Sequence, residues 1–241
     1  MQKTDKEKIV QGMFSSIARY YDLNNTLLSF GLHYHWKKKM VALAALRPGE
    51  TVVDVGAGTA DLALLAAEAV GENGFVIASD LNWPMLKIGQ QKLSGITLAK
   101  TDCLLANAES LPLQNQSVDV VLTGFCMRNV ADLPCALSEI FRVLKPSGRF
   151  ICLEFSTPSY KLLRRLYDFY SYQFLPAIGT AVSKDRTGVY QYLTDSIRAF
   201  PNQEAFAEKI KKAGFGNVSY QNLTGGIVAI HTGVKGNRPA T

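Results

Sequence analysis

The feature that most constrains the fold is an alternation of short apolar strands with helices between residues 51 and 156. The strand-like segments read TVVDV, FVIASD, ITLAK, SVDVVLTGF and RFICLEF, and the helix-like segments read DLALLAAEAV, PMLKIGQQKL and LPCALSEIFRVL. Strands that are apolar almost throughout are typical of a parallel sheet covered by helices on both faces. A further helical pattern, NQEAFAEKIKKAGF, precedes two late strands, NVSYQNL and GIVAIHTGV. We therefore predict an α/β fold with a mostly parallel, seven-stranded sheet.

The composition fits a folded protein that stays inside the cell. The chain has 241 residues, of which 47% are hydrophobic, and a net charge of +6 that mildly favours anionic surfaces. Its four cysteines show no CxxC pairing, so we expect neither a zinc site nor disulfides. We find no apolar signal core at the N-terminus and no apolar run near the roughly 18 residues of a membrane span. We expect a cytoplasmic protein without a bound metal.

A glycine turn follows the first strand, in the stretch VVDVGAGTADLALLAA at residues 52–67. The dinucleotide fingerprint GxGxxG has its third glycine where this chain has Asp61. A carboxylate about 4 Å from a phosphate costs on the order of 4 kcal/mol at an effective dielectric of about 20, so a pyrophosphate is disfavoured. S-adenosylmethionine suits the turn better, because Asp54 and Asp61 would attract its sulfonium and ammonium groups while Gly56 and Gly58 allow close approach.

The ends of later strands supply further cofactor-binding candidates. Asp80 closes the second strand, where a carboxylate accepts both hydroxyl protons of a ribose in NAD and S-adenosylmethionine sites alike. Asn107 and Ala108 follow the third strand, where an amide side chain can pair with an adenine edge, although a turn residue is an equally good interpretation of Asn107 alone. The complete predicted set comprises Asp54, Gly56, Gly58, Thr59, Asp61, Asp80, Leu81, Asn107, Ala108 and Thr123.

Two long stretches carry a resemblance to a known family. The first, YDLNNTLLSFGLHYHW, includes Tyr21, Asp22, Asn25, Ser29, His33 and Trp36. The second, RVLKPSGRFICLEFS, includes Arg142, Pro146, Gly148, Glu154 and Ser156. Together with GFCMRNVADL and the segment from YLTDSIRAFPNQE to NLTGGIVAIHTG, they resemble the ubiquinone/menaquinone biosynthesis C-methyltransferases, which are class I methyltransferases. The resemblance runs from about residue 11 to residue 235.

The chain departs from the family pattern at four positions, Asn24, Ala60, Gly124 and Ser147. Ala60 matters most, because a Cβ in the glycine turn would crowd the methionine end of the cofactor or oppose a positive φ. Gly124 stands where a small hydroxyl residue often contacts the cofactor in the family. We expect these departures to affect affinity rather than the charge of the site.

The resemblance implies a Rossmann-like class I methyltransferase fold with an N-terminal helical segment and a helical insertion after the fifth strand. We expect a single domain over residues 1–241. Within it we distinguish an N-terminal helical cap (1–47), a cofactor-binding core (48–156), a helical lid or substrate insertion (157–200), and a closing helix with two strands (201–235). The implied reaction moves a methyl group from S-adenosylmethionine to a ring carbon of a prenylated quinol.

Four residues are candidates for catalysis, namely Arg128, Asn129, Tyr21 and His33. An electron-rich quinol is already a carbon nucleophile once a hydroxyl is partly deprotonated, so positioning and one proton relay suffice. Arg128 would stabilise a phenolate and orient a water, Asn129 would hold one quinol oxygen and Tyr21 the other. The competing interpretations are a structural hydrogen-bonding role for His33, an apolar packing position for Tyr21, and a solvated face for the three lysines at 37–39.

Aromatic residues are unusually frequent between residues 160 and 174, which indicates a packed helical lid, an apolar passage for a polyprenyl tail, or both. With Arg164 and Arg165 nearby, we expect reversible association with anionic bilayers at the inner face of the membrane. The expected partner is a prenylated quinol and not a nucleic acid. A homodimer is compatible with the sequence.

Three other functions share parts of this pattern. A nicotinamide-dependent oxidoreductase is opposed by Asp61. A non-catalytic S-adenosylmethionine-binding partner in quinone synthesis is opposed by the pair Arg128 and Asn129, and a small-molecule methyltransferase with another acceptor would share every cofactor residue. The sequence does not distinguish a naphthoquinol from a benzoquinol substrate, although we favour conversion of demethylmenaquinol to menaquinol.

Overall fold

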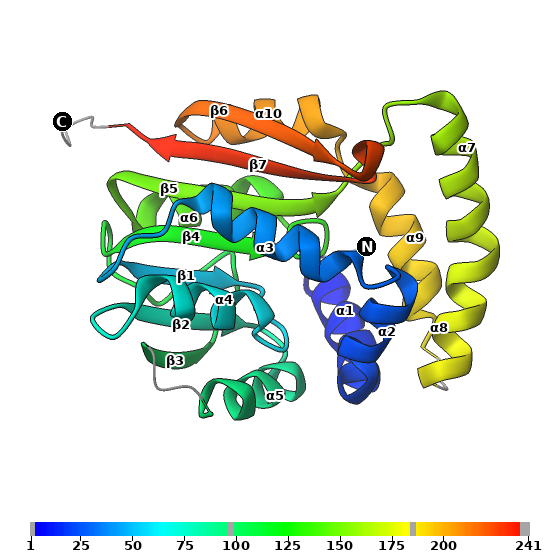
Figure 1. Cartoon of the computed structure of the whole chain (residues 1–241), viewed down its shortest axis with the longest axis horizontal. Coiled ribbons are helices and arrows are strands. Elements are labelled where there is room, and N and C mark those ends of the chain that lie inside the picture. The colour runs from blue at the N-terminus through cyan, green and yellow to red at the C-terminus, as the bar shows by residue number, and fades with distance from the viewer. Residues whose placement is uncertain (1–2, 96–98, 184–186, 237–241) are drawn as a thin grey trace.

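In the computed structural model, which describes residues 3–95, 99–183 and 187–236, a seven-stranded sheet has the order β3-β2-β1-β4-β5-β7-β6 (Figure 1). The strands are β1 (Thr51–Val55), β2 (Phe75–Asp80), β3 (Lys100–Leu105), β4 (Val118–Gly124), β5 (Leu144–Phe155), β6 (Phe215–Leu223) and β7 (Val228–Lys235). The first five pair in parallel, whereas β7 runs antiparallel between β5 and β6. The prediction of a mostly parallel, seven-stranded sheet is confirmed.

The strand order fixes where a ligand can bind. Chain order runs outward from β1 through β2 to β3, and then returns to the other side of β1 with β4. Ligands of open α/β sheets bind in the crevice at the carboxyl ends of the strands, beside such a reversal. Here the reversal brings the loops after β1, β2, β3 and β4 to one edge of the sheet.

The third strand lies later in the chain than its apolar run indicated. The predicted strand ITLAK covers residues 96–100, of which 96–98 lie outside the described residues, and the structure has β3 at Lys100–Leu105. This strand is at the edge of the sheet and its side chains are half-buried or exposed. An edge strand needs no continuous apolar run, and for that reason the sequence pattern placed it too early.

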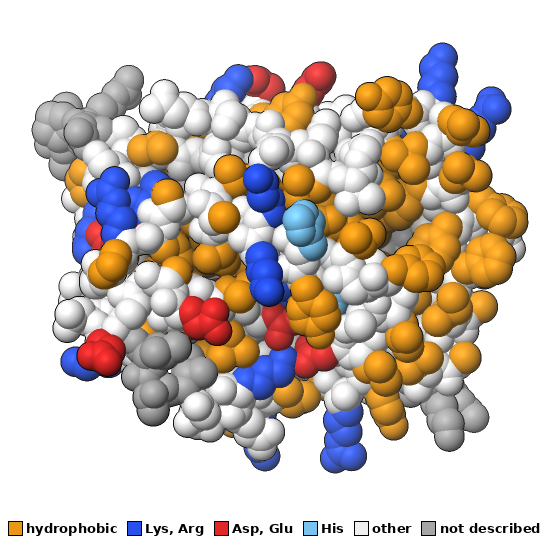
Figure 2. All heavy atoms as spheres, in the orientation of Figure 1, with side chains coloured by type: hydrophobic (Ala, Val, Ile, Leu, Met, Phe, Trp, Pro, Cys, Tyr) orange, Lys and Arg blue, Asp and Glu red, His pale blue; other side chains and the backbone are white. Residues whose placement is uncertain are grey.

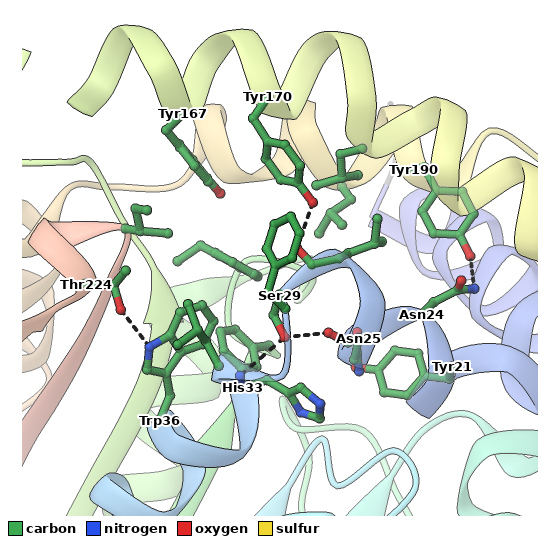
Figure 3. A pocket seen from close by; sticks show the side chains of 18 of the residues that line it. Tyr21, Asn24, Asn25, Ser29, His33, Trp36, Tyr167, Tyr170, Tyr190 and Thr224 are labelled. Carbon is green, nitrogen blue, oxygen red and sulfur yellow. Dashed lines mark hydrogen bonds between the residues drawn. The ribbon is translucent and has the colours of Figure 1, made fainter. Parts of the chain in front are cut away.

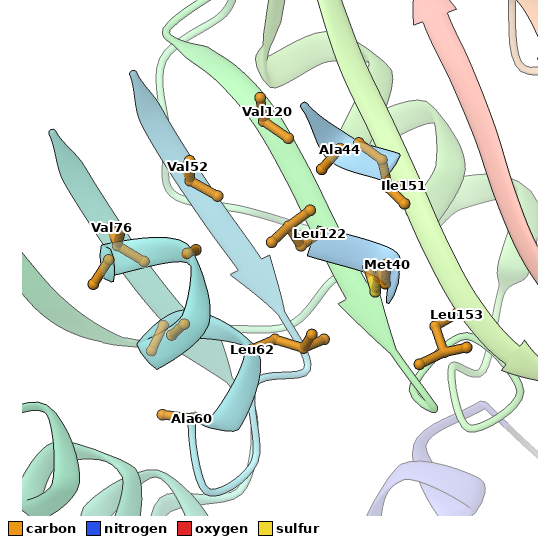
Figure 4. Packing of buried hydrophobic residues seen from close by; sticks show 14 of the residues in the cluster. Met40, Ala44, Val52, Ala60, Leu62, Val76, Val120, Leu122, Ile151 and Leu153 are labelled. Carbon is orange, nitrogen blue, oxygen red and sulfur yellow. The ribbon is translucent and has the colours of Figure 1, made fainter. Parts of the chain in front are cut away.

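Alternate side chains of the central strands fill two apolar cores, one on each face of the sheet. On one face, Val52 and Val120 pack under the helices α3 (Leu32–Ala44), α4 (Asp61–Val70) and α5 (Trp83–Leu93). Figure 4 shows Met40 and Ala44 of α3 lying over this face. On the opposite face, Val53 packs with α6 (Leu133–Val143) and α10 (Gln203–Lys212). The period of two along each strand therefore accounts for the two helical layers.

Two helical segments cover the carboxyl ends of the strands. The N-terminal segment consists of α1 (Lys3–Ile17), a 3-10 turn, α2 (Tyr21–Leu28) and α3, and we call α1 and α2 the cap. The insertion after β5 consists of α7 (Lys161–Phe169), a π-helical turn (Tyr170–Phe174), α8 (Leu175–Ser183) and α9 (Val189–Ala199). Ile17 of the cap packs against Leu175, Val189 and Tyr190 of the insertion. The cap and the insertion thus form one helical layer at the carboxyl ends of the strands, whereas α3 lies over a face of the sheet (Figure 1).

Candidate active site

Two cavities lie between the strand ends and the helical layer. The strand-end cavity has a volume of about 120 Å³ and is bounded by the turn after β1, the ends of β2, β3 and β4, and helix α1. The aromatic cavity has a volume of about 300 Å³ and is bounded by α2, α3, α7 and α9. Phe14, Tyr21 and Phe125 line both cavities, which therefore adjoin each other.

The glycine turn forms one wall of the strand-end cavity. Gly56 and Gly58 have positive φ angles of 73° and 54°, which glycine adopts without strain. A Cβ on Gly56 would lie 2.2 Å from Sγ of Cys126, so a larger residue does not fit there. The amides of Gly56 and Ala57 both donate to the carbonyl of Ser79, at 2.8 and 2.9 Å, and this anchors the turn to β2.

Ala60 and Gly124 depart from the family pattern without obstructing the strand-end cavity. Ala60 adopts a positive φ of 66°, and its Cβ is buried against α5, where a Cβ built on Gly89 would approach it to 2.9 Å. The expected crowding of the cofactor by Ala60 is therefore not found. At Gly124 a Cβ would meet Cδ1 of Leu62 at 2.6 Å, so the glycine makes room for a core leucine.

Asp80 lies in the wall of the strand-end cavity, as expected for a ribose-binding carboxylate. One of its oxygens accepts a hydrogen bond from the amide of Gly58 and the other from the amide of Asn82, each at 2.7 Å. Burial raises the pKa of this carboxyl, while the backbone hydrogen bonds oppose the rise. Each oxygen keeps a second lone pair with which it can accept a hydroxyl proton. Leu81 lines the same cavity.

Asn107 and Ala108 also line the strand-end cavity. The Asn107 side-chain oxygen accepts from the amide of Glu109 at 3.0 Å, and its amide nitrogen donates to Oε1 of Glu7 at 3.1 Å. Glu7 belongs to α1, so the N-terminal helix reaches over the cavity and its carboxylate becomes part of the wall. Glu7 was not among the residues predicted from the sequence, because its contact with Asn107 joins residues a hundred positions apart.

Four of the predicted cofactor-binding residues lie behind the wall rather than in it, namely Asp54, Thr59, Asp61 and Thr123. Asp54 is buried and accepts from the amide of Ala63 at 3.1 Å. Burial raises its pKa to about 7, so it carries only part of a negative charge at neutral pH. Thr123 is fully buried in β4, and the hydroxyl of Thr59 donates to Asp22 at 2.6 Å. These residues support the turn.

Asp61 does not line the strand-end cavity, contrary to the expectation that its carboxylate attracts the cofactor. Its carboxylate lies 2.7 Å from Nζ of Lys37 and 2.8 Å from Nζ of Lys92, and Lys92 also binds Asp22 at 2.6 Å. Although burial alone would raise it, these two lysines hold the pKa of Asp61 below its ordinary value. The charge of Asp61 is thus matched locally and does not face the cavity. Lys37, expected on a solvated face, is buried.

Tyr21 and His33 lie where the cap meets the aromatic cavity (Figure 3). Tyr21 lines both cavities, and burial raises the pKa of its phenol, while a side-chain hydrogen bond with Asn25 opposes the rise. The Nε2 atom of His33 lies 3.1 Å from the hydroxyl of Thr26. Burial, followed by the charge of Lys37, lowers the pKa of His33 to about 4, so this imidazole is neutral at neutral pH.

Arg128 and Asn129 follow β4 but face different cavities. Arg128 lines the aromatic cavity, and its Nη1 donates to Oε1 of Glu154 at 2.8 Å and to the carbonyl of Phe125. Asn129 lines the strand-end cavity, where its side-chain oxygen accepts from the hydroxyl of Tyr192 at 3.2 Å. That Asn129 holds a quinol oxygen stays a prediction, and Tyr192, which bonds to Asn129, lines the aromatic cavity.

The aromatic cavity contains several polar groups that were not predicted from the sequence as catalytic or cofactor-binding residues. Trp36 donates from its indole nitrogen to Thr224 at 2.9 Å, Tyr170 donates to the carbonyl of Leu28 at 2.8 Å, and Asn24 donates to the hydroxyl of Tyr190. The remaining wall is largely leucine, phenylalanine and tyrosine (Figure 3). A flat aromatic ring with a hydrocarbon tail matches this lining.

The sequence and the fold of the chain are similar to those of known proteins. The model of the ubiE/COQ5 methyltransferase family matches residues 1–235. The ubiquinone/menaquinone biosynthesis C-methyltransferase UbiE of Pseudoalteromonas translucida is 43% identical over 97% of this chain and 93% of its own length. UbiE of Francisella tularensis subsp. novicida is 44% identical over 96% and 92%. A SAM-dependent methyltransferase from Aquifex aeolicus, 18% identical, superposes with a TM-score of 0.60 over 82% of this chain and 88% of its own, which shows a shared fold.

Proposed function

The chain belongs to the ubiE/COQ5 methyltransferase family, and from this premise we propose that it methylates a ring carbon of a prenylated quinol with S-adenosylmethionine. The resemblance drawn from the sequence is thereby confirmed, as is the Rossmann-like class I methyltransferase fold. The observation that carries the proposal is the pair of adjoining cavities, one polar at the strand ends and one aromatic beneath the insertion. Conversion of demethylmenaquinol to menaquinol is the reaction that we favour.

The charge of the strand-end cavity supports this choice of cofactor. Among the described residues that line it, Glu7, Asp80 and Glu109 bear carboxylates and none is a lysine or arginine. Such a wall suits a cation and repels a pyrophosphate, which argues against a nicotinamide cofactor. Asp80 would accept the ribose hydroxyls, Asn107 with Ala108 would contact the adenine, and the glycine turn would allow close approach. When bound, S-adenosylmethionine supplies an electrophilic methyl group on a sulfonium centre.

The protein's part in the reaction is to orient the quinol and to take up a proton. Methylation replaces a ring hydrogen, so one proton leaves the substrate in each turnover. His33 is neutral and its buried Nδ1 has no hydrogen-bond partner among the described residues, which makes it a candidate acceptor. The Nε atom of Arg128 is likewise buried and without a partner there, and it can donate to a ring oxygen. Tyr21 and Tyr192 are further hydroxyls in the same wall.

The outer face of α7 supports a contact with the membrane. Leu162 and Phe169 are 71% and 61% exposed on this face, and Leu166, which is 59% exposed, also lines the aromatic cavity. Figure 2 shows hydrophobic side chains gathered at the right-hand edge, over α7 and α8. No helix in the described part of the chain is both long and apolar enough to cross a bilayer. We infer a cytoplasmic enzyme that rests reversibly on anionic lipid with the outer face of α7, so that the polyprenyl tail enters from the bilayer.

Methyl transfer to two candidate lipids tests the function. The purified protein is supplied with methyl-labelled S-adenosylmethionine and either reduced demethylmenaquinone or the reduced prenylated methoxybenzoquinone precursor, and label is followed into the lipid extract. Label in either product supports the proposal and identifies the ring. No label in either lipid, with cofactor binding measured by calorimetry, would instead indicate another acceptor or a non-catalytic binding protein.

A further inference from the structure

Three aromatic side chains occupy the passage between the two cavities. Of the described residues, Phe14, Tyr21 and Phe125 line both the strand-end cavity and the aromatic cavity, and we call these three the aromatic collar. Two of them come from the cap and the third comes from the turn after β4. If one cavity holds the cofactor and the other the quinol, the migrating methyl group must pass through this collar.

The two collar residues of the cap lie against each other and against the glycine turn. The ring centroids of Phe14 and Tyr21 are 6.1 Å apart with an interplanar angle of 60°. The ring of Tyr21 reaches the turn after β1, since its Cε1 atom lies 4.0 Å from the position that a Cβ on Gly58 would take. The cap therefore contributes aromatic surface at the end of the strand-end cavity that opens toward the aromatic cavity.

The third collar residue is held in an unusual backbone conformation. Phe125 has a φ of 58°, in the left-handed region that a residue with a bulky side chain rarely adopts. Its amide donates to the carbonyl of Leu153 at 2.8 Å, and its carbonyl accepts from the side chains of Arg128 and Asn129. Strained residues that the surrounding structure fixes in this way occur preferentially at functional sites. The conformation holds the Phe125 ring where it lines both cavities.

Electron-rich aromatic faces attract cations, including sulfonium and quaternary ammonium groups. The carboxylates that line the strand-end cavity come from α1, the end of β2 and the turn after β3. Each of the three collar residues contributes an aromatic ring. We propose that the aromatic collar binds the sulfonium charge and so distinguishes S-adenosylmethionine from its uncharged thioether product, S-adenosylhomocysteine. This inference rests on the proposed function.

The collar has a definite consequence for the catalytic cycle. Positive charge is present on sulfur before transfer and absent afterwards, so the attraction is lost when the methyl group leaves. The collar residues then favour retention of the charged cofactor and release of the product. Because the sulfonium charge is also reduced in the transition state, the collar stabilises the bound cofactor more than it stabilises the transition state. It therefore lowers the Kd and the KM for S-adenosylmethionine without raising kcat.

Calorimetric titration with both cofactor forms tests the inference. The intact protein and its Phe14→Leu and Tyr21→Leu variants are titrated with S-adenosylmethionine and with S-adenosylhomocysteine. Leucine keeps apolar volume but removes the aromatic face, so the Kd for S-adenosylmethionine should rise by about three- to tenfold while that for S-adenosylhomocysteine changes less than about twofold. Tyr21→Phe is the matched control, since it removes only the hydroxyl and should keep the preference.

A second control separates the collar from the aromatic cavity as a whole. Tyr167 of α7 lines the aromatic cavity but not the strand-end cavity. Tyr167→Leu should leave both dissociation constants unchanged. If the leucine variants weaken both cofactor forms equally, the collar does not recognise charge and the inference is wrong. If the unaltered protein binds neither form, the proposed function itself fails.

Discussion

The carboxylate of Glu154 lies 2.8 Å from Nη1 of Arg128, and the two side chains are only 1% and 4% exposed. The same carboxylate accepts from the backbone amide of Arg128 at 3.3 Å, and the guanidinium lies 5.3 Å from the ring of Phe155. Arg128 also donates to the carbonyl of Phe125. The buried pair therefore fixes the turn after β4 and, with it, the direction in which the remaining guanidinium nitrogens point.

Breaking this pair should cost both stability and activity. Glu154→Gln leaves a buried guanidinium without its counter-charge, so we expect the free energy of unfolding, measured in urea, to fall by roughly 3 to 5 kcal/mol. A double variant, Arg128→Met with Glu154→Leu, replaces the pair by apolar groups and should recover most of that loss. If the double variant is stable but inactive toward the quinol, Arg128 has a role in the reaction. Full activity in the double variant would restrict Arg128 to a structural role.

Lys92 of α5 binds two carboxylates, and its removal should weaken both the stability of the fold and the support of the glycine turn. Lys92 binds both Asp22 and Asp61, and Asp22 in turn accepts from Thr59. Lys92→Met therefore takes the lysine from Asp22 and leaves Asp61 with Lys37. We expect a loss of about 1 to 2 kcal/mol in the free energy of unfolding and a weaker affinity for S-adenosylmethionine in calorimetry. Lys87→Met, an exposed change on the same helix, is the control. Equal effects of the two substitutions would contradict this expectation.

Ala60 and Gly89 should behave as an interacting pair. A Cβ on Gly89 would lie 2.9 Å from that of Ala60, so Gly89→Ala alone should destabilise the turn even though alanine favours the helix. Ala60→Gly removes the opposing methyl group and relieves a left-handed backbone, so the double variant should recover part of the loss. The remainder reflects the backbone of Gly58 and Thr59, each 3.2 Å from the Cβ on Gly89. We expect a coupling free energy on the order of 1 to 2 kcal/mol in a urea double-mutant cycle. Additive effects within about 0.5 kcal/mol would show that the two sites do not interact.

The strand-end cavity could be predicted from the sequence because its residues lie at, or directly after, the ends of strands. Asp80, Asn107 and Gly56 need only the alternation of strands and helices to be placed on one edge of the sheet. Asp61 was misjudged because the lysines that bind it belong to α3 and α5, and nothing local in the sequence indicates those contacts. Lys37 shares the buried side of α3 with Met40, although three consecutive lysines suggested solvent.

Loops and lid helices limited what the sequence could predict about the aromatic cavity. Arg128 and Asn129 are adjacent in an irregular turn, where no periodicity indicates that their side chains face different cavities. The aromatic residues at 160–174 divide in a similar way, since Tyr167 and Tyr170 line the aromatic cavity while Phe169 and Phe174 are exposed. Only the packing of the insertion against the cap decides that division.

Acid should destabilise the protein partly through His231. Burial lowers its pKa to about 4 from an ordinary value of 6.5, although its hydrogen bond to the carbonyl of Gln203 opposes the shift. Between these two pH values the unfolded chain binds a proton that the folded protein does not. The contribution of His231 to the free energy of unfolding is therefore constant above about pH 6.5. As the pH decreases from 6.5 toward 4, this residue lowers the free energy of unfolding by roughly 2 to 3 kcal/mol.

Urea unfolding at a series of pH values checks this contribution. His231→Gln keeps a hydrogen-bond donor but does not titrate, so its free energy of unfolding should fall less steeply below pH 6.5 than that of the unaltered protein. His33, with its pKa also lowered to about 4, adds to the fall, whereas Asp54, with its pKa raised to about 7, opposes it. Because both are present in each protein, the difference between the two curves isolates His231. Parallel curves would contradict the assignment.

Binding to lipid vesicles should depend on the charge and the apolar face of α7. Lys161, Arg164 and Arg165 flank its exposed leucines, and each cation near an anionic bilayer contributes about 1 kcal/mol. Changing these three to glutamine should lower partitioning to vesicles that contain an anionic phospholipid by about a hundredfold at low salt, as measured by co-sedimentation. Changing the apolar residues Leu162, Leu166 and Phe169 to glutamine should also reduce it, at any salt concentration.

A matched charge change elsewhere decides whether α7 is the docking face. Lys209, Lys211 and Lys212 are exposed on α10, which packs against β6 and β7 rather than in the helical layer that contains α7, and their replacement by glutamine removes the same net charge. If α7 docks, this variant keeps most of the vesicle binding when the variants are compared at about 0.1 M salt, because a charge farther from the bilayer than the Debye length, about 10 Å at that salt, contributes little. If both triple variants lose binding equally, net charge alone governs the association. The outer face of α7 would then have no special part in admitting the polyprenyl tail.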